Sequence, residues 1–488
     1  MKRSIFLLTL VLGPVLFSSC DKYLQLEHRS VADEKSFYKT SQDAIVATNA
    51  AYNPLQEIHR STQGIWLLAE VASDNTDDPD VSIDNLTLGT SHAAVLQAWQ
   101  YHYLGIARCN TVLNRLPGIS MDASLRNRLM LEAQFLRGLY YFNLVRLFGP
   151  VPLVTQETKD LEQTLPTNLP ARASEDEIYT QIIADFTAAE ALPATYSSSD
   201  LGRATRGAAK AYLAKVYLTR KNWAQAAAKA KEVMDSQVYQ LLPSYANVFA
   251  VTQKNSRESI FEVQYFIGAQ SGTGNFLGHN LHELFAPAGS GSSVTGVTGS
   301  NGVGRNIPSD ELVEAYEAGD PRKEASLKTS YINASGNVVN VNYTLKYLDP
   351  SATGGTQGGS GVGSSNSVRV YRYADLLLVY AEALNEQQGG SQEALEALNS
   401  VRRRARSGQS GVLPDWTGLS QAALREAIDR ERRVELAFEN HRWFDLVRTG
   451  KTKAVLVQTK NIQIRNTLYP IPERERTINP KLTQNDGY

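Results

Sequence analysis

The stretch that decides the fold is Arg206 to Met234, which reads RGAAKAYLAKVYLTRKNWAQAAAKAKEVM. Small residues recur at helical spacing in two consecutive runs, with a polar break just before Trp223. Small side chains let two helices approach closely, while larger ones such as Leu213 and Tyr217 fill the groove between them. The stretch therefore predicts a tightly packed pair of antiparallel helices.

The spacing of Ala214, Ala226 and Ala230 in this pair matches a tetratricopeptide unit. A similar pair is predicted from Tyr373 to Asn385 and from Glu393 to Arg406. One such unit cannot bury its own apolar faces, so several must stack. We expect a mainly α fold, a tetratricopeptide-like superhelix of about four helix pairs that are not contiguous in the sequence.

Helical periodicity and end signals predict further helices in the first half of the chain. They are expected over 41–58 with Ser41 as N-cap, over 93–116 up to Pro117-Gly118, over 126–148 up to Gly149-Pro150, and after Ser174, where Glu177 completes a capping box.

Two stretches lack any helical or strand period. Gly268 to Gly304 is rich in Gly, Ser and Thr, and Ser351 to Ser367 is rich in Gly. Long polar loops of this kind are functional surface or linker, so we expect an irregular, loop-rich subdomain that binds a ligand. The C-terminus from Tyr469 onward is expected to be extended, because three prolines oppose a helix there.

Composition narrows the class of protein. The 488 residues contain 49 Lys and Arg against 50 Asp and Glu, and 42% are hydrophobic. Binding to nucleic acid requires a concentrated excess of basic residues, so we expect no nucleic-acid partner. The hydrophobic content excludes disorder as the main theme, and the length favours two or more subdomains.

The N-terminus reads as a secretion signal. A basic start and an apolar run from Ile5 to Phe17 precede Ser18-Ser19-Cys20, and the run is shorter than the roughly 20 residues of a spanning helix. Leu16 to Cys20 resembles the lipobox of bacterial lipoproteins, which implies cleavage after residue 19 and lipid attachment at Cys20. Ordinary secretion with a free Cys20 is the alternative. Asp21 leaves the choice between inner and outer membrane open, because Asp after the lipidated Cys favours inner-membrane retention in many Gram-negative bacteria.

No motif predicts catalysis. The sequence has no nucleophile elbow, P-loop or dinucleotide fingerprint. Glu431, Glu435 and Glu439 form a row at i, i+4 spacing among arginines, which favours a charge network that locks a helix in place over an acid–base pair facing a cleft.

Two segments carry side chains that can bind a metal, but neither has the spacing of a known metal site. Oxygen-bearing side chains from Asp74 to Asp84 suit Ca²⁺, but Pro79 stands where an EF-hand needs Gly, so a hydrogen-bonded polar loop is favoured. His279 and His282 match no zinc motif. We expect no cofactor and no metal.

Several motifs together resemble the SusD/RagB family of nutrient-uptake lipoproteins. They are Arg430 to Glu439 followed by Arg442 to Arg448, Tyr469-Pro470-Ile471-Pro472, Gln484 to Tyr488, Glu132 to Arg137, Phe148 to Leu153, Asp320-Pro321-Arg322, Arg372 to Asp375, and Asn399 to Arg404.

The resemblance implies a lipoprotein on the outer face of the outer membrane that binds an oligosaccharide and passes it to a SusC-like TonB-dependent β-barrel transporter. In that family the tetratricopeptide face contacts the transporter and loops on the opposite side hold the ligand. The implied organisation is a signal peptide over 1–19, an N-terminal region over 20–240, an irregular region over 241–368 and a C-terminal region over 369–488, with 241–488 forming the RagB/SusD domain.

A sugar site needs flat aromatic faces surrounded by Asn, Asp and Arg. The candidate ligand residues on predicted loops are Trp66, Asp74, Asn75, Asp77, Asn85, Phe276, His279, Tyr343 and Tyr347. The two Gly-rich loops contain no Trp and little Tyr, which weakens the case for an aromatic arc of the kind that binds starch.

Three alternatives remain beside oligosaccharide uptake. Peptide uptake follows from the RagB-like members of the family, and a lid or scaffold without ligand affinity follows from the scarcity of loop aromatics. An extracellular hydrolase is disfavoured because no acid–base or metal constellation emerges.

Overall fold

The structure is a computed structural model that describes residues 37–60, 62–160, 162–266, 278–355, 361–464 and 466–488. Its framework is a set of four packed helix pairs. They are α2 (Ser41–Arg60) with α4 (Ala93–Arg115), α5 (Ala123–Phe148) with α6 (Glu175–Ala189), α7 (Arg206–Thr219) with α8 (Trp223–Asp235), and α14 (Tyr373–Gln388) with α15 (Gln392–Ala405). No helix in these described ranges is both long and apolar enough to cross a membrane.

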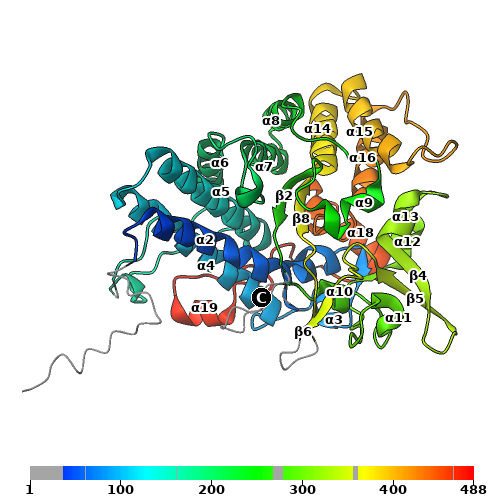
Figure 1. The fold of residues 1–488 in the computed structure, drawn as a ribbon, viewed down its shortest axis with the longest axis horizontal. Helices are drawn as coiled ribbons and strands as arrows, with labels where there is room; N and C mark the ends of the chain where they lie inside the picture. Colours follow the sequence, from blue (N-terminus) through cyan, green and yellow to red (C-terminus); the bar gives the residue numbers. More distant parts are fainter. Residues whose placement is uncertain (1–36, 61, 161, 267–277, 356–360, 465) are drawn as a thin grey trace, which may run out of the picture.

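The pairs stack on one another, as Figure 1 shows from α2 at one side to α15 at the other. Helix α5 packs on α4, α7 packs on α6, and α14 packs on α8 although more than a hundred residues separate α8 from α14. Each pair thereby buries the apolar face that it cannot bury alone. The prediction of a mainly α, tetratricopeptide-like fold is confirmed.

The signals at Ser174 and Gly149 mark helix ends as predicted, whereas α5 begins three residues before its predicted start, with Asp122 as N-cap, and α2 has a different cap. The Ser174 hydroxyl and the Glu177 carboxylate form the predicted capping box at the start of α6, and Gly149, at φ +69°, ends α5. Ser41 is not the N-cap of α2. The Thr40 hydroxyl accepts the Asp43 N–H at 3.2 Å, and the Asp43 carboxylate accepts the Thr40 N–H at 2.9 Å, which makes Thr40 the cap.

The C-terminal part adds helices to the framework: α16 (Gln421–Glu435), α17 (Arg442–Thr449), α18 (Thr452–Lys460) and α19 (Glu473–Ile478). The expectation of an extended C-terminus is wrong for α19. Pro472 stands at its N-cap and Pro480 follows its end, so the prolines flank a short helix, where they are tolerated. Helix α19 lies against α4, where Gln100 Nε2 donates to Glu475 Oε1 at 2.9 Å (Figure 1).

Over the described residues, short strands form four two-stranded antiparallel sheets, and all strands but β1 lie in or end just after the region 241–368 that was expected to be irregular. The paired strands are β1 (Thr76–Asp77) with β3 (Ile307–Pro308), β2 (Ser259–Val263) with β8 (Val368–Arg372), β4 (Leu327–Ile332) with β5 (Val338–Thr344), and β6 (Thr353–Gly355) with β7 (Gly361–Gly363). The prediction that 351–367 lacks strands is therefore wrong, because β6 and β7 pair across it. Glycine lacks a side chain, but its backbone N–H and C=O groups can still form the hydrogen bonds that pair two strands.

Short helical segments connect these elements. They are η1 (Leu67–Val71), α3 (Val81–Asp84), η2 (Leu116–Gly118), η3 (Glu162–Thr164), η4 (Ser198–Asp200), α9 (Tyr245–Val248), η5 (Val251–Gln253), α10 (Leu281–Leu284), α11 (Ser292–Thr295), α12 (Asp310–Ala315) and α13 (Pro321–Ser326). Helices α10 and α11 fall within 268–304, which was also expected to be without regular structure.

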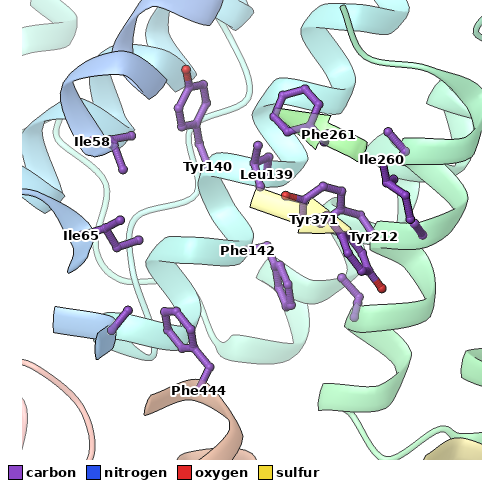
Figure 2. Close-up of a cluster of buried hydrophobic side chains, with 14 of the residues drawn as sticks. Ile58, Ile65, Leu139, Tyr140, Phe142, Tyr212, Ile260, Phe261, Tyr371 and Phe444 are labelled. Carbon is purple, nitrogen blue, oxygen red and sulfur yellow. The ribbon is translucent and has the colours of Figure 1, made fainter. Parts of the chain in front are cut away.

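Aromatic rings join the helix stack to the β2–β8 ladder, as the close-up in Figure 2 shows. The ring of Tyr212 on α7 meets Tyr371 on β8 edge-on at 5.3 Å and Phe261 on β2 at 6.3 Å between centroids. All three side chains are buried. The ladder is therefore part of the same hydrophobic core as the helix pairs.

The glutamates form the predicted charge network, but only Glu431 and Glu435 lie on α16, because the helix ends at Glu435 and Glu439 follows in a turn. Glu435 accepts from Arg372 at 3.1 Å and from Arg322 at 3.2 Å, and it also contacts Arg404. Glu439 accepts from Arg372 at 2.6 Å and from Lys346 at 2.7 Å. All of these side chains are buried, so the glutamates are held by cations of the protein and do not face a cleft.

Candidate functional site

The β1–α3 segment, residues 73–85, carries four of the nine candidate ligand residues. Strand β1 pairs with β3, with Thr76 opposite Pro308, and α3 follows after a short turn. The segment is thereby connected to residues more than two hundred positions away in the chain.

Glu70 anchors this segment to the C-terminal motif. Its buried carboxylate accepts the Asn75 side-chain N–H at 2.9 Å and the backbone N–H groups of Phe438 at 2.8 Å and Asn440 at 2.9 Å. Burial raises the pKa of Glu70 to about 7, although the three donors oppose that rise. Hydrogen bonds to Glu70 thus hold the β1–α3 segment and the C-terminal motif together.

Asp74 and Asn75 face inward, which corrects their prediction as ligand residues. Arg442 donates to both oxygens of Asp74 at 2.7 and 3.1 Å, and Arg433 donates to Asn75 Oδ1 at 3.0 Å. Burial opposes ionisation of Asp74, but Arg442 and Arg433 together hold its pKa below the ordinary value. Asp74 and Asn75 are each 1% exposed, so they hold the segment in place and present no polar atom to a ligand.

Two further basic residues, which sequence reasoning missed, support the segment. Arg305 donates to both oxygens of Asp78 at 2.7 and 2.9 Å, and Lys460 donates to Asp84 at 2.5 Å and to the Thr76 carbonyl at 2.7 Å. No local pattern could have paired them, because each partner lies hundreds of residues away. The segment is consequently a rigid surface element.

The side chains that this element presents to solvent are Asp77, Pro79, Val81 and Asn85. The Asp77 side chain is 54% exposed, and Asn85 is exposed one turn beyond it across α3. A carboxylate accepts hydrogen bonds, and an amide both donates and accepts them, which suits the hydroxyl groups of a sugar. Among the predicted residues, Asp77 and Asn85 are the pair whose polar atoms reach solvent, and Asp77 Oδ1 also forms an ion pair with Lys460 Nζ at 3.6 Å.

The aromatic candidates Trp66, His279 and Tyr347 belong to the core, which corrects that part of the prediction. Trp66 packs edge-on against Phe285 at 5.1 Å, and Phe285 packs against Tyr347 at 5.6 Å. Tyr347 Oη donates to the Phe438 carbonyl at 3.0 Å. His279 packs edge-on against Tyr265 at 5.0 Å. Each candidate is at most 6% exposed, so none offers an open ring face for a sugar.

The remaining aromatic candidates do not join this element. Tyr343 lies on β5, is 7% exposed, and packs edge-on against Tyr331 at 6.4 Å between centroids. Burial raises the pKa of its hydroxyl. Phe276 lies outside the described residues, as do Cys20 and the predicted signal peptide.

The two metal sites considered from the sequence have no supporting geometry. Over the described ranges, no three His, Cys, Asp or Glu side chains gather as a metal site would require. The Asp74, Asp78 and Asp84 carboxylates are paired with Arg or Lys. His279 Nδ1 accepts the Leu281 N–H at 3.3 Å, and His282 Nδ1 accepts the Asp349 N–H at 2.7 Å, while Nε2 of each is buried without a hydrogen-bond partner among the described residues.

Fold and surface together define a helix-repeat protein whose loop-rich half carries a rigid polar surface element. Family models described as "SusD family" and "Starch-binding associating with outer membrane" match residues 328–488 and 29–218. "SusD-like protein P2" of Formosa agariphila is 31% identical over 496 residues, which cover 93% of this chain and 94% of that protein. The chain belongs to the SusD family.

Solved structures agree with this assignment. A structure titled "Laminarin binding SusD-like protein" superposes with a TM-score of 0.81 at 30% identity, covering 92% of this chain and all of that one. Surface glycan-binding protein A from Bacteroides thetaiotaomicron, solved with laminarihexaose, superposes with a TM-score of 0.76 over 92% of this chain and all of its own. Its identity is 22%, so this second likeness concerns the fold alone.

Proposed function

We propose that this protein binds an oligosaccharide at the outer membrane and delivers it to a SusC-like TonB-dependent transporter. A lipid on Cys20 would anchor the protein in the same membrane as the transporter. The observation that carries the proposal is the match at 30% identity, across nearly the whole chain, to a protein that binds laminarin. The family description of starch binding with outer-membrane association supports the location.

The β1–α3 segment is the proposed contact surface. Asp77 and Asn85 would bond to sugar hydroxyls from a backbone that the Arg305–Asp78 and Lys460–Asp84 pairs hold still. Preorganised polar groups lose little entropy on binding, which favours recognition of a flexible oligosaccharide. The surface lacks a described exposed ring, so hydrogen bonds carry the interaction.

No catalytic step is part of the proposal. The carboxylates of Glu431 and Glu435 on α16 and of Glu439 just beyond it are buried and paired with Arg or Lys. A general acid or nucleophile would have to reach a substrate, and these cannot. The acidic row is therefore part of the scaffold.

Isothermal titration of the mature protein with laminarihexaose, maltohexaose and a mixed peptide library tests the proposal. We expect binding to a glycan and at least a fivefold loss of affinity in the double variant Asp77→Ala/Asn85→Ala, because two hydrogen-bonding groups are removed. The matched control is Asp235→Ala/Asn337→Ala, which alters the same residue types at exposed positions elsewhere. Binding only to peptides would favour the RagB-like alternative.

A lid without ligand affinity is a second candidate function. The observation that favours it is the burial of Trp66, His279 and Tyr347, which removes these aromatic candidates from the surface. In that case deletion of the whole protein would abolish glycan uptake by cells, whereas Asp77→Ala/Asn85→Ala would leave uptake unchanged. Co-purification with a β-barrel transporter is expected under both functions.

A further inference from the structure

Two neighbouring hollows open beside β2, and neither includes a residue of the β1–α3 segment. Their volumes are about 380 and 220 Å³. The two hollows share the lining residues Leu201, Gly202, Arg203, Phe261 and Glu262. They therefore form one continuous groove that is divided by residues 201–203. The larger hollow falls within the size range of small-molecule sites.

One wall of the larger hollow is a polar face of α2. Asn49, Tyr52, Asn53 and Gln56 follow one another at helical spacing and line it. Gln264, which follows β2, lies opposite, where its carbonyl accepts from Gln56 Nε2 at 2.7 Å. Helix α2 and strand β2 are thus joined at one end of the groove, and both are visible in Figure 1.

Amide groups in the groove are held in fixed orientations. Gln264 and Asn255 exchange side-chain hydrogen bonds at 2.9 and 3.1 Å. Gly202 makes this close packing possible, because a Cβ at that position would lie 2.6 Å from the Gln264 side chain and its φ is +92°. Oriented amides that neighbour open space are a common device for reading hydroxyl groups.

The charged side chains of the larger hollow are neutralised within the protein. Arg203 donates to Asp200 at 2.7 Å and to Glu132 at 2.9 Å, while Glu262 forms an ion pair with Arg369 at 3.4 Å. No net charge is left to attract an ionic ligand at this end. The hollow therefore fits a neutral molecule better than a charged one.

Apolar surface accompanies the polar groups. Leu201 is 53% exposed at the point where the two hollows meet. Tyr52 contributes its ring to the larger hollow, while its hydroxyl donates to Glu132 and accepts the Ala204 N–H, both at 3.0 Å. A pyranose ring presents C–H faces as well as hydroxyls, so it matches this mixture of apolar and amide surface.

The smaller hollow contains hydroxyls that lack partners. Tyr196 Oη and Ser259 Oγ line it, are shielded from bulk solvent, and have no hydrogen-bond partner among the described residues. A shielded hydroxyl without a partner is costly, so such groups are normally satisfied by water or a ligand. Both hydroxyls lie beneath the surface of the groove, so they mark a polar wall and not an open contact point.

From these features we infer that the groove is a second carbohydrate-binding site, separate from the β1–α3 segment, whose larger hollow takes a short neutral oligosaccharide. The sugar hydroxyls bond to Asn49 and Asn53, and a C–H face packs on Leu201. The ligand class rests on the proposed function, whereas the location rests on the groove alone.

Titration and hydrogen exchange test the inference with the mature full-length protein and laminarihexaose or maltohexaose as probes. We expect wild-type titrations to require two sites, and Asn49→Ala/Leu201→Ala to lose one of them or to weaken it at least tenfold. Both substitutions are at exposed positions, so the fold should persist. Leu165→Ala/Asn337→Ala, also at exposed positions, is the matched control and should retain both sites.

Amide exchange measured by mass spectrometry then locates each site. Binding in the groove should slow exchange in peptides covering 194–205 and 255–264, and this protection should vanish in Asn49→Ala/Leu201→Ala but persist in Asp77→Ala/Asn85→Ala. Protection confined to 73–85, or equal binding by the groove variant and its control, would overturn the inference and leave the proposed function intact. Preference of the groove for sulfated or carboxylated sugars would overturn the neutral ligand. Absence of binding to any probe contradicts both proposals.

Discussion

Replacement of Glu435 by Gln tests whether the buried charge network stabilises the fold. The Glu435 carboxylate contacts three guanidiniums, those of Arg322, Arg372 and Arg404, from three separate parts of the chain. The side chain is fully buried, and the nearby cations lower its pKa although burial opposes this. Gln has nearly the same volume, so the substitution removes the charge without leaving a cavity.

The size of the effect follows from what each arginine retains. Arg372 and Arg404 still contact Glu258, and Arg322 still contacts Asp320, so no cation loses its last partner. Removing one member of a buried ion pair costs about 3 to 5 kcal/mol, and the remaining partners place Glu435→Gln near the lower end, about 3 kcal/mol.

Urea unfolding at pH 7, followed by circular dichroism, measures this change in the free energy of unfolding. The matched control is Glu396→Gln, because Glu396 pairs with Arg403 at 2.5 Å while their side chains are 54% and 41% exposed. An exposed pair contributes less than about 1 kcal/mol. If Glu435→Gln destabilised the protein no more than Glu396→Gln, the idea that this network holds the C-terminal motif in place would be refuted.

Three other predictions follow. Burial lowers the pKa of His102 to about 4, so protonation of the unfolded chain reduces the free energy of unfolding as the pH falls from 6.5 toward 4. In urea titrations, His102→Gln should make the stability loss between pH 6.5 and 5 smaller by about 2 kcal/mol. Gly105→Ala would place a Cβ 2.3 Å from the Tyr140 ring and should lower stability by about 1 to 3 kcal/mol in thermal unfolding, whereas Gly118→Ala, with open space around it, should change it little. Cys20→Ser should move the protein from the membrane to the soluble fraction of cells, and retention in the membrane would contradict lipid attachment there.

Much of the fold could be predicted from local patterns. The helix pair at Arg206–Met234 and the pair beginning at Tyr373 are both present, because close packing of small residues leaves a strict period in the sequence. The β6–β7 hairpin and helix α19 were missed. Glycine-rich strands and a six-residue helix between prolines depend on partners elsewhere, and local propensity does not register them.

The candidate ligand site shows the limit more sharply. The residue types correctly predicted that 73–85 is polar and structured by hydrogen bonds. They did not predict which of its side chains point outward. Asp74 and Asp77 are three residues apart and of the same type, yet Arg442 buries the first while the second is exposed. Burial depends on what packs against a residue, and Arg442 arrives from the far end of the chain.

Local sequence and composition were enough for the helix-pair architecture, for the near-neutral charge that argues against a nucleic-acid partner, and for the family motifs, because each depends on residues close together or on overall composition. Tertiary packing alone placed Trp66, His279 and Tyr347 in the core and brought Asn49, Leu201, Ser259 and Gln264 to one groove. The physical reason is that a surface site is assembled from distant segments, whose mutual burial and hydrogen bonding exist only once the chain has packed.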